Sequence, residues 1–451
     1  MSERADLVVR ARRVITADGS GARALHIRGG VIAAVAEHDD VPAAARLIDV
    51  GDRVIMPGLV DTHVHCNEPG RTQWEGFRTA TRAAAAGGIT TIVDMPLNSI
   101  PATTTVAALE AKRAAARGQC AVDVGFWGGV VPGNARDLAP LVAAGVLGFK
   151  CFLVPSGVDE FGAVGERELR EAMPILRDLG VPLLVHAEVP GPIARGEASV
   201  TGRDRRSYAT WLDSRPDAAE VEAFEMMASL SEELGTRVHI VHLATDRVLP
   251  LLRAARARGV PISAETCPHY LHFAAEEIAD GATEYKCAPP IRRRDRRGAL
   301  LAALAGDLSM IVSDHSPCPP EMKMRETGDF MRAWGGIASL QLGLSIAWTD
   351  LEPVHYELDD IARLMCAAPA KLAGLGDSVG ALAVGRDANF IVFDPRAAFT
   401  VDAQRLEHRH KLTPYDGARL RGVVEQTWLR GEPIFDRGAF AGQPRGRLVG
   451  S

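Results

Sequence analysis

The sequence lacks any uninterrupted apolar run that approaches the roughly 20 residues needed to cross a bilayer. Its first residues, 1–6, are largely polar or charged and include no apolar segment of the kind found in signal peptides. Seven cysteines are scattered along the chain without a Cys-x-x-Cys pair, so their spacing implies no disulfide framework. We therefore expect a cytoplasmic protein without a membrane partner.

An excess of positive charge is also lacking. The chain carries 51 lysine and arginine residues against 57 aspartate and glutamate residues, which gives a formal net charge of −6. This balance provides no general basic field for nucleic acid or anionic lipid. One local basic run occurs, and we expect it to lie on a solvated helix face rather than to bind nucleic acid: Arg292, Arg293, Arg294, Arg296 and Arg297.

What the chain does contain is enough apolar material for a large core. Hydrophobic residues make up 47% of the 451 positions and charged residues 24%, as in soluble globular proteins. The length exceeds that of one average domain, but it suits a (β/α) barrel with a smaller appended domain.

One pattern repeats between Pro57 and Gly374: a short apolar, β-branched run is followed by a helical segment. Runs this short and apolar are typical of parallel strands that are buried on both faces. We expect eight such strands, at residues 58–65, 89–95, 121–129, 146–152, 181–188, 237–244, 260–266 and 308–314. Helices at 166–179 and 218–234 lie among the intervening segments, and several segments end at a glycine that favours the left-handed C′ conformation: Gly118, Gly180, Gly235 and Gly259. Eight units of this kind predict an α/β fold of the TIM type, a (β/α)8 barrel.

The two ends of the chain have a different texture, with short strands around glycine-rich turns. We expect such strands at residues 5–15, 24–27 and 30–35, and again at 389–393, 423–429 and 433–435. The prediction is one small, discontinuous β-sandwich domain built from residues 1–56 and 375–451. The barrel domain then spans residues 57–374.

The chemistry of such a barrel lies at the carboxyl ends of its strands, and several predicted strands end in metal-binding side chains. His63 and His65 are two apart on the first strand and therefore share a face. Four further side chains of this kind end the fourth, fifth, sixth and eighth strands: Lys150, His186, His242 and Asp314. Taken singly, each histidine fits a hydrogen-bonded core residue, and Asp314 fits a helix cap. Their joint coincidence with strand ends favours a metal site.

Alternation along a strand separates these residues from two neighbours. His239 is three positions from His242, and His315 follows Asp314 directly, so both are out of phase with the predicted ligands in a regular strand. We expect both to be packing or supporting residues.

A lysine among these histidines has a chemical explanation. A buried lysine shifts readily towards the neutral amine, which adds carbon dioxide to give a bridging carbamate. Imidazoles, the carbamate of Lys150 and the carboxylate of Asp314 would together hold two divalent ions, which activate water near neutral pH. In the hydrolysis of an amide, Asp314 could then carry the proton from water to the nitrogen that leaves.

Several segments resemble one known family. The first-strand motif PGLVDTHVH at 57–65, GFKCF at 148–152, SDHSP at 313–317 and GALAVGRDA at 380–388 are similar to motifs of the amidohydrolase superfamily, in its cyclic-amidase branch. Within that branch, four stretches resemble the allantoinases: NEPGRT at 67–72, DMPLNS at 94–99, KCAPPIR at 286–292 and HRHKLTPY at 408–415.

The resemblance implies a barrel fold, a two-metal site and a homotetramer. It implies that His63 and His65 bind the more buried metal with Asp314, and that carboxylated Lys150 bridges to a second metal on His186 and His242. Zinc is the first expectation, and cobalt, manganese and iron stay open because imidazole and carboxylate ligands accept all of them.

The residue at position 67 bears on the substrate. Dihydroorotases resemble this chain but carry an arginine there, which suits a substrate carboxylate. Asn67 is uncharged and favours a neutral, amide-rich ring such as (S)-allantoin, which would be hydrolysed to allantoate; a local turn is its simpler explanation. We expect the small-molecule substrate to contact Asn67, Asn98, Cys287 and Pro289.

Three alternatives stay open. Arg71 could supply the missing charge, so dihydroorotate remains a candidate substrate. Hydantoinases and dihydropyrimidinases also take neutral rings, but are not expected to carry the stretch EPGR at 68–71. A non-catalytic scaffold of the same fold is disfavoured, because every predicted ligand position is filled.

Overall fold

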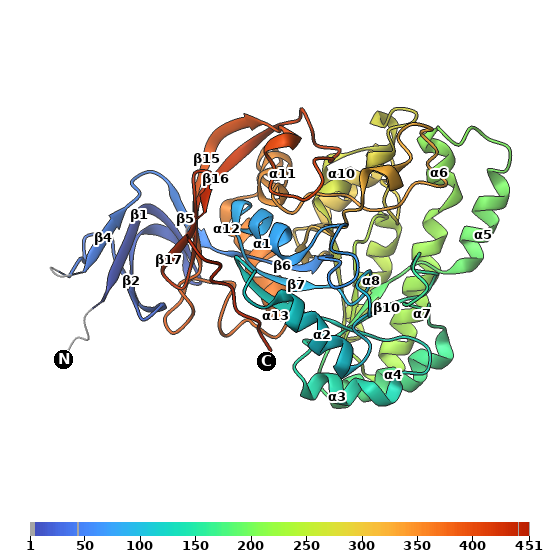
Figure 1. Ribbon diagram of the computed structural model, residues 1–451, viewed down its shortest axis with the longest axis horizontal. Helices are drawn as coiled ribbons and strands as arrows, with labels where there is room; N and C mark the ends of the chain where they lie inside the picture. Colours follow the sequence, from blue (N-terminus) through green and yellow to red (C-terminus); the bar gives the residue numbers. More distant parts are fainter. Residues whose placement is uncertain (1–4, 43–44, 441, 451) are drawn as a thin grey trace.

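Eight parallel strands form the centre of the molecule (Figure 1). The computed structural model describes residues 5–42, 45–440 and 442–450, so part of the charged N-terminal stretch, residues 1–4, lies outside the described residues. The barrel strands are β6 (Leu59–Val64), β7 (Ile89–Asp94), β8 (Asp123–Phe126) with its short continuation β9 (Gly128–Gly129), β10 (Phe149–Phe152), β11 (Leu183–His186), β12 (Val238–Ile240), β13 (Ile262–Thr266) and β14 (Met310–Ile311). Each lies within a predicted strand.

The barrel closes where its first and last strands meet. Strands β6 to β8 form one stretch of sheet and β9 to β14 the other, and β9 follows β8 after a single residue. A parallel bridge between Val64 and His315 joins β6 to the chain just past β14. All but one of the strand residues are buried, which explains the near-continuous apolar runs in the sequence.

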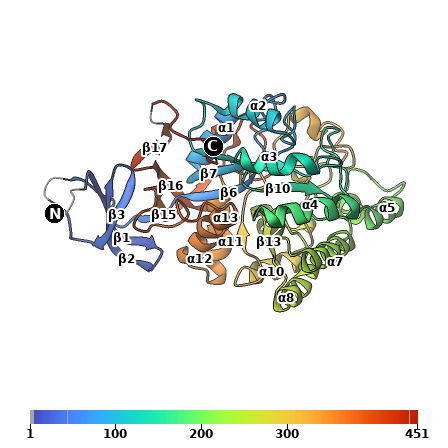
Figure 2. The ribbon, with the colours of Figure 1, turned by 90° about the horizontal axis from the view of Figure 1, so that it is seen from below.

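Helices surround these strands, as the view from below in Figure 2 shows. They are α1 (Phe77–Ala86), α2 (Val106–Ala116), α3 (Leu138–Ala143), α4 (Glu166–Asp178), α5 (Pro190–Ser199), α6 (Tyr208–Ser214), α7 (Asp217–Leu234), α8 (Leu249–Ala257), α9 (Pro268–His272), α10 (Arg294–Ala303), α11 (Gly343–Leu351), α12 (Leu358–Ala362) and α13 (Ala368–Leu372), with a π-helical turn at Arg363–Ala367. None of the described helices is long and apolar enough to span a bilayer.

Helix α4 illustrates why these segments are helical. Its buried residues are Leu169, Ala172, Met173 and Leu176, a spacing that places them on one stripe against the barrel. The carboxylate of Glu168 accepts a hydrogen bond from the amide of Gly165 at the start of the helix. All four glycines predicted to end helical segments have positive φ, from 70° to 85°.

The two ends of the chain meet in one nine-stranded sheet. Its strands are β1 (Leu7–Thr16), β2 (Gly19–Arg28), β3 (Val31–Glu37), β4 (Arg46–Asp49), β5 (Val54–Pro57), β15 (Phe390–Thr400), β16 (Arg419–Leu429), β17 (Glu432–Asp436) and β18 (Ala439–Phe440). Strand β5 was not predicted, yet it joins the halves because it pairs with β1 on one side and β15 on the other. The predicted domain bounds at 56/57 and 374/375 stay a prediction.

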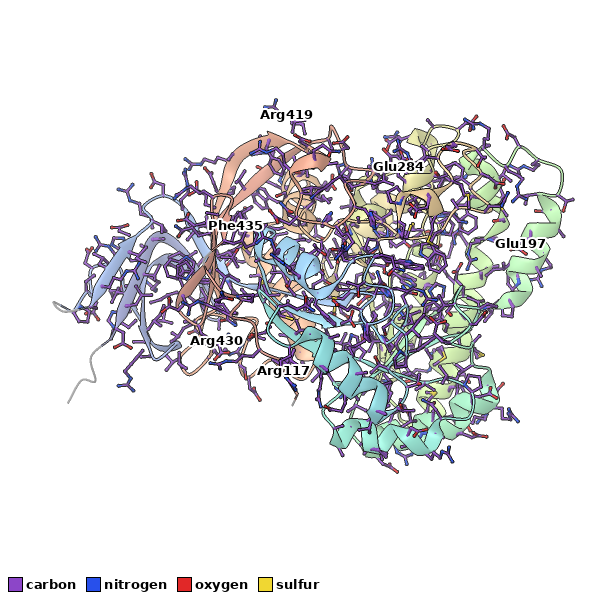
Figure 3. The ribbon with its side chains drawn as sticks, viewed as in Figure 1. Arg117, Glu197, Glu284, Arg419, Arg430 and Phe435 are labelled. Carbon is purple, nitrogen blue, oxygen red and sulfur yellow. The ribbon has the colours of Figure 1, made fainter. Side chains whose placement is uncertain are left out.

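A largely buried ion pair helps to fasten this terminal sheet to the barrel. Arg430, labelled in Figure 3, lies at the end of β16 and contacts Asp123 of β8 at 2.6 Å. Both side chains are largely buried, so the pair is shielded from salt.

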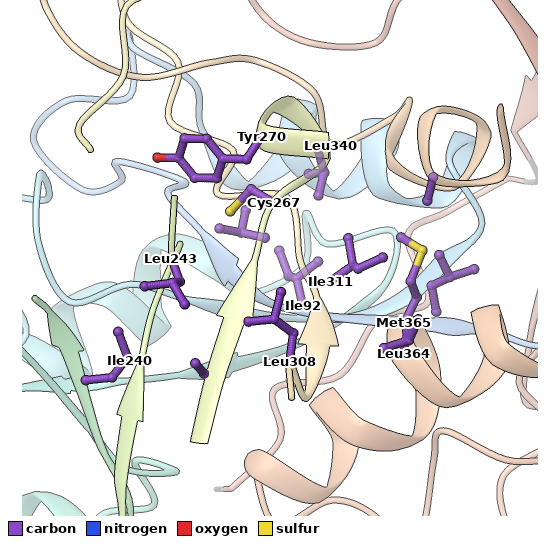
Figure 4. Close-up of a cluster of buried hydrophobic side chains, with 14 of the residues drawn as sticks. Ile92, Ile240, Leu243, Cys267, Tyr270, Leu308, Ile311, Leu340, Leu364 and Met365 are labelled. Atoms are coloured by element: carbon purple, nitrogen blue, oxygen red, sulfur yellow. The ribbon is translucent and has the colours of Figure 1, made fainter. Parts of the chain in front are cut away.

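The barrel core is apolar below its functional end. Figure 4 shows Ile240, Ile311 and Met365 in one cluster that brings together strands β12 and β14 and the π-helical turn. Cys267 belongs to the same cluster, and burial raises the pKa of its thiol well above the ordinary value.

The basic run differs from its prediction. Arg293 and Arg294 are exposed as expected, but Arg292 is buried and pairs with Glu220 at 2.7 Å and Asp217 at 3.3 Å. Arg296 also contacts Asp217, at 3.4 Å. The predicted solvated position is wrong for Arg292, because the acidic start of α7 packs against this side chain. Local sequence does not reveal such a long-range contact.

Candidate metal centre

The six predicted metal-binding side chains lie at one end of the barrel. His63, Lys150 and His186 belong to β6, β10 and β11, while His65, His242 and Asp314 follow the ends of β6, β12 and β14. All six line one cavity of about 250 Å³. The structure therefore brings together residues that are up to 251 positions apart in the chain.

The spacing of the donor atoms suits metal ions. Asp314 Oδ1 lies 3.1 Å from His63 Nε2 and 3.7 Å from His65 Nε2. On the other side of the cavity, His186 Nδ1 lies 2.9 Å from His242 Nε2. Ligands bound at about 2.0–2.1 Å around a tetrahedral ion are about 3.3 Å from one another. Both groups are thus close to the spacing that one cation requires.

Two of these residues have an unusual backbone. His242 has φ 40° and Asp314 has φ 44°, in the left-handed region that non-glycine residues rarely adopt. Such conformations persist where the surrounding structure imposes them, and they cluster at functional sites. Here they turn side chains into the cavity from just beyond the strand ends.

The same backbone change overturns the alternation argument for His239. Because His242 lies past the end of β12, strict alternation does not apply, and both side chains face the barrel interior. His239 contacts Glu265 Oε2 at 2.9 Å and does not line the cavity. His315 also lies outside the cavity lining, where its Nδ1 accepts a hydrogen bond from the amide of Ser339 at 3.2 Å.

Two buried glutamates that the sequence analysis missed hold the histidines in place. Glu265 Oε1 lies 2.5 Å from His63 Nδ1, and Glu188 Oε2 lies 2.8 Å from His186 Nε2. Each contact leaves the other ring nitrogen to face the cavity, as in carboxylate–histidine–metal arrangements. Both glutamates lay within predicted strands, at residues 260–266 and 181–188, so charged residues in otherwise apolar runs were the available signal.

Burial controls the protonation of the remaining groups. It lowers the pKa of His65 and His242 well below the ordinary value, and it lowers the pKa of Lys150 to about 8. Burial alone would raise the pKa of Asp314, but the charge and hydrogen bond of His63, together with the charges of His242 and His65, hold that pKa well below the usual range. Neutral imidazoles and an ionised carboxylate are the forms that bind metal.

His63 is the exception to this pattern. Burial lowers its pKa, but the neighbouring charges of Asp314 and Glu265 outweigh burial and raise it. A cation between the imidazole of His63 and the carboxylate of Asp314 would interact favourably with the same negative charges. His242 Nδ1 is in addition buried and has no hydrogen-bond partner among the described residues. The donor set therefore fits metal ions.

The predicted substrate contacts are only partly brought together. Asn98 and Cys287 line the cavity, and Asn98 Nδ2 lies 3.5 Å from His65 Nδ1. Asn67 and Pro289 are not among the lining residues: Asn67 Nδ2 donates to Pro317 O at 3.4 Å, and Pro289 O accepts from a tyrosine hydroxyl. Substrate roles for these four residues stay predictions.

Further residues line the cavity besides the predicted ligands and substrate contacts. The lining also includes Phe152, Trp211, Lys286, Arg332 and Trp334. Phe152 ends β10 and Trp211 lies in α6, while Lys286, Arg332 and Trp334 come from loops whose approach to the strand ends depends on the folded barrel.

Comparisons with known proteins agree with this site. A model of the amidohydrolase family matches residues 54–434, and the chain belongs to this family. It is similar over 98% of its length to an allantoinase of Streptomyces avermitilis (50% identity, 98% of that chain) and to one of Arabidopsis thaliana (42% identity, 90% of that chain). The family implies a binuclear metal centre, and His63, His65 and Asp314 form a potential metal site.

Solved structures confirm the predicted fold class. An L-hydantoinase (dihydropyrimidinase) from Arthrobacter aurescens has a TM-score of 0.94 at 30% identity, with 99% of this chain and all of that chain covered. A D-hydantoinase (dihydropyrimidinase) from Thermus sp. has a TM-score of 0.89 at 26% identity, with 98% of both chains covered. The chain is thus a (β/α)8 barrel with a β-sandwich domain, and a hydrolase of the cyclic-amidase branch.

Glu265 provides a test of this centre. We expect Glu265→Gln to weaken metal binding by about 10- to 100-fold, because the neutral amide no longer supports the imidazole of His63 as a donor. Competition with a chromophoric chelator measures the affinity. Glu225→Gln, which removes an exposed carboxylate from α7, is the matched control and is expected to bind metal like the wild type. Equal affinities in all three proteins would contradict the assignment.

Proposed function

We propose that the protein is an allantoinase, which hydrolyses the cyclic amide bond of (S)-allantoin to give allantoate. The observation that carries the proposal is the similarity to allantoinases along 98% of the chain, together with the convergence of the six predicted ligands on one cavity. The proposal includes a homotetramer, which rests on the resemblance alone, and a cytoplasmic location, which rests on the composition of the sequence; light scattering measures the assembly.

The metal ligands are part of the proposal. His63, His65 and Asp314 would hold one divalent ion, His186 and His242 would hold the second, and carboxylated Lys150 would supply a shared ligand. Zinc is the first candidate, with cobalt, manganese and iron as alternatives. When bound, such a pair of ions makes water nucleophilic near neutral pH and polarises a carbonyl group.

Lys150 becomes a ligand by reacting with carbon dioxide. Its amine is buried, 5.2 Å from the ring of Phe152, and its lowered pKa of about 8 leaves a substantial neutral fraction near pH 7–8. The neutral nitrogen forms a bond to the carbon of CO₂ and loses one proton. The product is a carbamate whose oxygens carry the negative charge.

Asp314 moves the proton. Its ionised carboxylate accepts a proton as water adds to the ring carbonyl carbon, and returns that proton to the ring nitrogen as the C–N bond breaks. Ring opening thus leaves a neutral nitrogen and a carboxylic acid, which loses its remaining proton to solvent near neutral pH. The hydroxyl of Ser316 donates to Asp314 Oδ1 at 2.8 Å and restrains the carboxylate during both transfers.

The charges around the cavity favour a neutral ring. Arg71, the possible carboxylate-binding residue, is already paired with Glu160, and Arg215 makes two hydrogen bonds to Glu188. The side-chain oxygen of Asn98 is buried and has no hydrogen-bond partner among the described residues. An N–H group of an amide ring would donate a hydrogen bond to this oxygen. Arg332 lies exposed in the cavity lining, so dihydroorotate belongs in the test.

The decisive experiment compares steady-state hydrolysis of allantoin, hydantoin, dihydrouracil and dihydroorotate by the metal-loaded protein. We expect allantoin to have the highest kcat/KM, because its ureido tail and ring offer amide groups to the cavity, whereas Arg71 and Arg215 are already paired with carboxylates. A higher kcat/KM for any other ring would contradict the proposal that allantoin is the substrate. If none of the four rings is hydrolysed, the assignment to the cyclic amidases is contradicted.

Carboxylation of Lys150 has a separate readout. Protein prepared with ¹³C-labelled bicarbonate is expected to give a carbamate signal by NMR, and Lys150→Ala is expected to lose both the signal and part of its bound metal. Lys371→Ala on the surface of the barrel is the control, since that lysine is exposed. If the Lys150→Ala protein keeps wild-type metal content and activity, Lys150 is not a bridging metal ligand.

A further inference from the structure

His269 is a buried histidine beside the metal centre to which the mechanism above gives no role. It lies in the first turn of α9, immediately after β13, and its side chain has no exposed surface. Neither ring nitrogen has a hydrogen-bond partner among the described residues. Buried polar groups are nearly always bonded, so an imidazole with two unpartnered nitrogens indicates a partner of another kind.

Two polar side chains close to His269 lie at the metal centre. One ring nitrogen of His269, the sulfur of Cys267 and one carboxylate oxygen of Asp314 all lie within 4.8 Å of one another. Burial lowers the pKa of His269 to about 4, so the ring is neutral and carries one donor and one acceptor. The N–H group of the neutral His269 ring can therefore donate a hydrogen bond towards the ionised carboxylate of Asp314.

A single water molecule matches this spacing. Two hydrogen bonds of about 2.8 Å that meet at a tetrahedral oxygen span about 4.6 Å. A water among Asp314, His269 and the thiol of Cys267 would have three polar neighbours, which is the usual number for a buried water.

We propose that His269 is a positioning residue for Asp314, to whose carboxylate it donates through this water. Asp314 must accept a proton and then release it in another direction, so its orientation has to persist through both transfers. Ser316 restrains one oxygen of the carboxylate. The bond from His269 restrains the group from the side of α9. The inference rests on the proposed hydrolytic function, but not on the identity of the ring.

The same three residues could in principle hold a third cation. Thiolate is the form of cysteine that binds metal. Burial, with the added charges of Asp314 and Glu265, raises the pKa of Cys267 well above its ordinary value, which opposes this form. The neutral thiol therefore favours water over a metal ion, and metal analysis decides between them.

The test compares His269→Leu with His269→Gln in the metal-loaded protein. Leucine keeps the volume without a polar atom, and glutamine supplies a donor and an acceptor again. We expect kcat to fall about 10- to 100-fold in His269→Leu, with KM within about twofold of the wild type and metal content unchanged. We expect His269→Gln to recover most of the lost kcat.

His272→Leu is the matched control. It removes a histidine from the same helix that contacts Asp350 rather than the metal centre, and wild-type kcat is expected. If His269→Leu does not fold, His269→Met takes its place. All variants are compared on the ring that the wild type hydrolyses fastest, so a wrong substrate does not affect this test.

Three results would overturn the proposal. They are an unchanged kcat in His269→Leu, an equal loss of kcat in the leucine and glutamine variants, and the loss of a third equivalent of metal when His269 is replaced. The first two would make His269 a packing residue, and the last would make it a ligand.

Discussion

His63 and Asp314 meet across the seam where the barrel closes, and the rest of the site is arranged around this contact. Their side chains lie 3.1 Å apart, although they come from the first and last strands. Asp61 reinforces the seam, because its carboxylate accepts hydrogen bonds from the backbone amides of His63 and Ser313, both at 3.0 Å. The contacts that close the barrel therefore also bring the predicted metal ligands His63 and Asp314 together.

Buried carboxylates behind the histidines stabilise the ionisable groups of this site. Several ionisable groups at one end of a barrel would repel or lose their charge unless each had a partner. Glu265 binds both His63 and His239, and Glu188 binds His186 and Arg215. These carboxylates orient the imidazoles towards the cavity and balance positive charge from below. Metal ions and a carbamate on Lys150 would complete this balance from above.

Features encoded locally were predicted from the sequence. Short apolar runs predicted the barrel strands, glycines such as Gly235 predicted helix ends, and residues at strand ends predicted the cavity lining. Each of these depends on periodicity or backbone preference within a few residues. This is why six widely separated side chains could be grouped before their contacts were known.

Features that depend on long-range packing were not predicted. Alternation failed at His242 because the backbone leaves the strand there, and Glu265 received no role because its partner His63 is 202 residues away. Strand β5 is too short for a clear pattern, and Arg292 is buried by acidic residues of another helix. Asn67 was expected at the substrate, but it is not among the residues that line the cavity.

The central claim is that these six side chains hold two metal ions in one cavity. Anomalous diffraction from crystals of the zinc-loaded protein, recorded on both sides of the zinc absorption edge, counts the ions and locates them. The account predicts two peaks, one among His63, His65 and Asp314 and the other beside His186 and His242, with density for carboxylated Lys150 between them. A single peak, or peaks that contact other side chains, would contradict it.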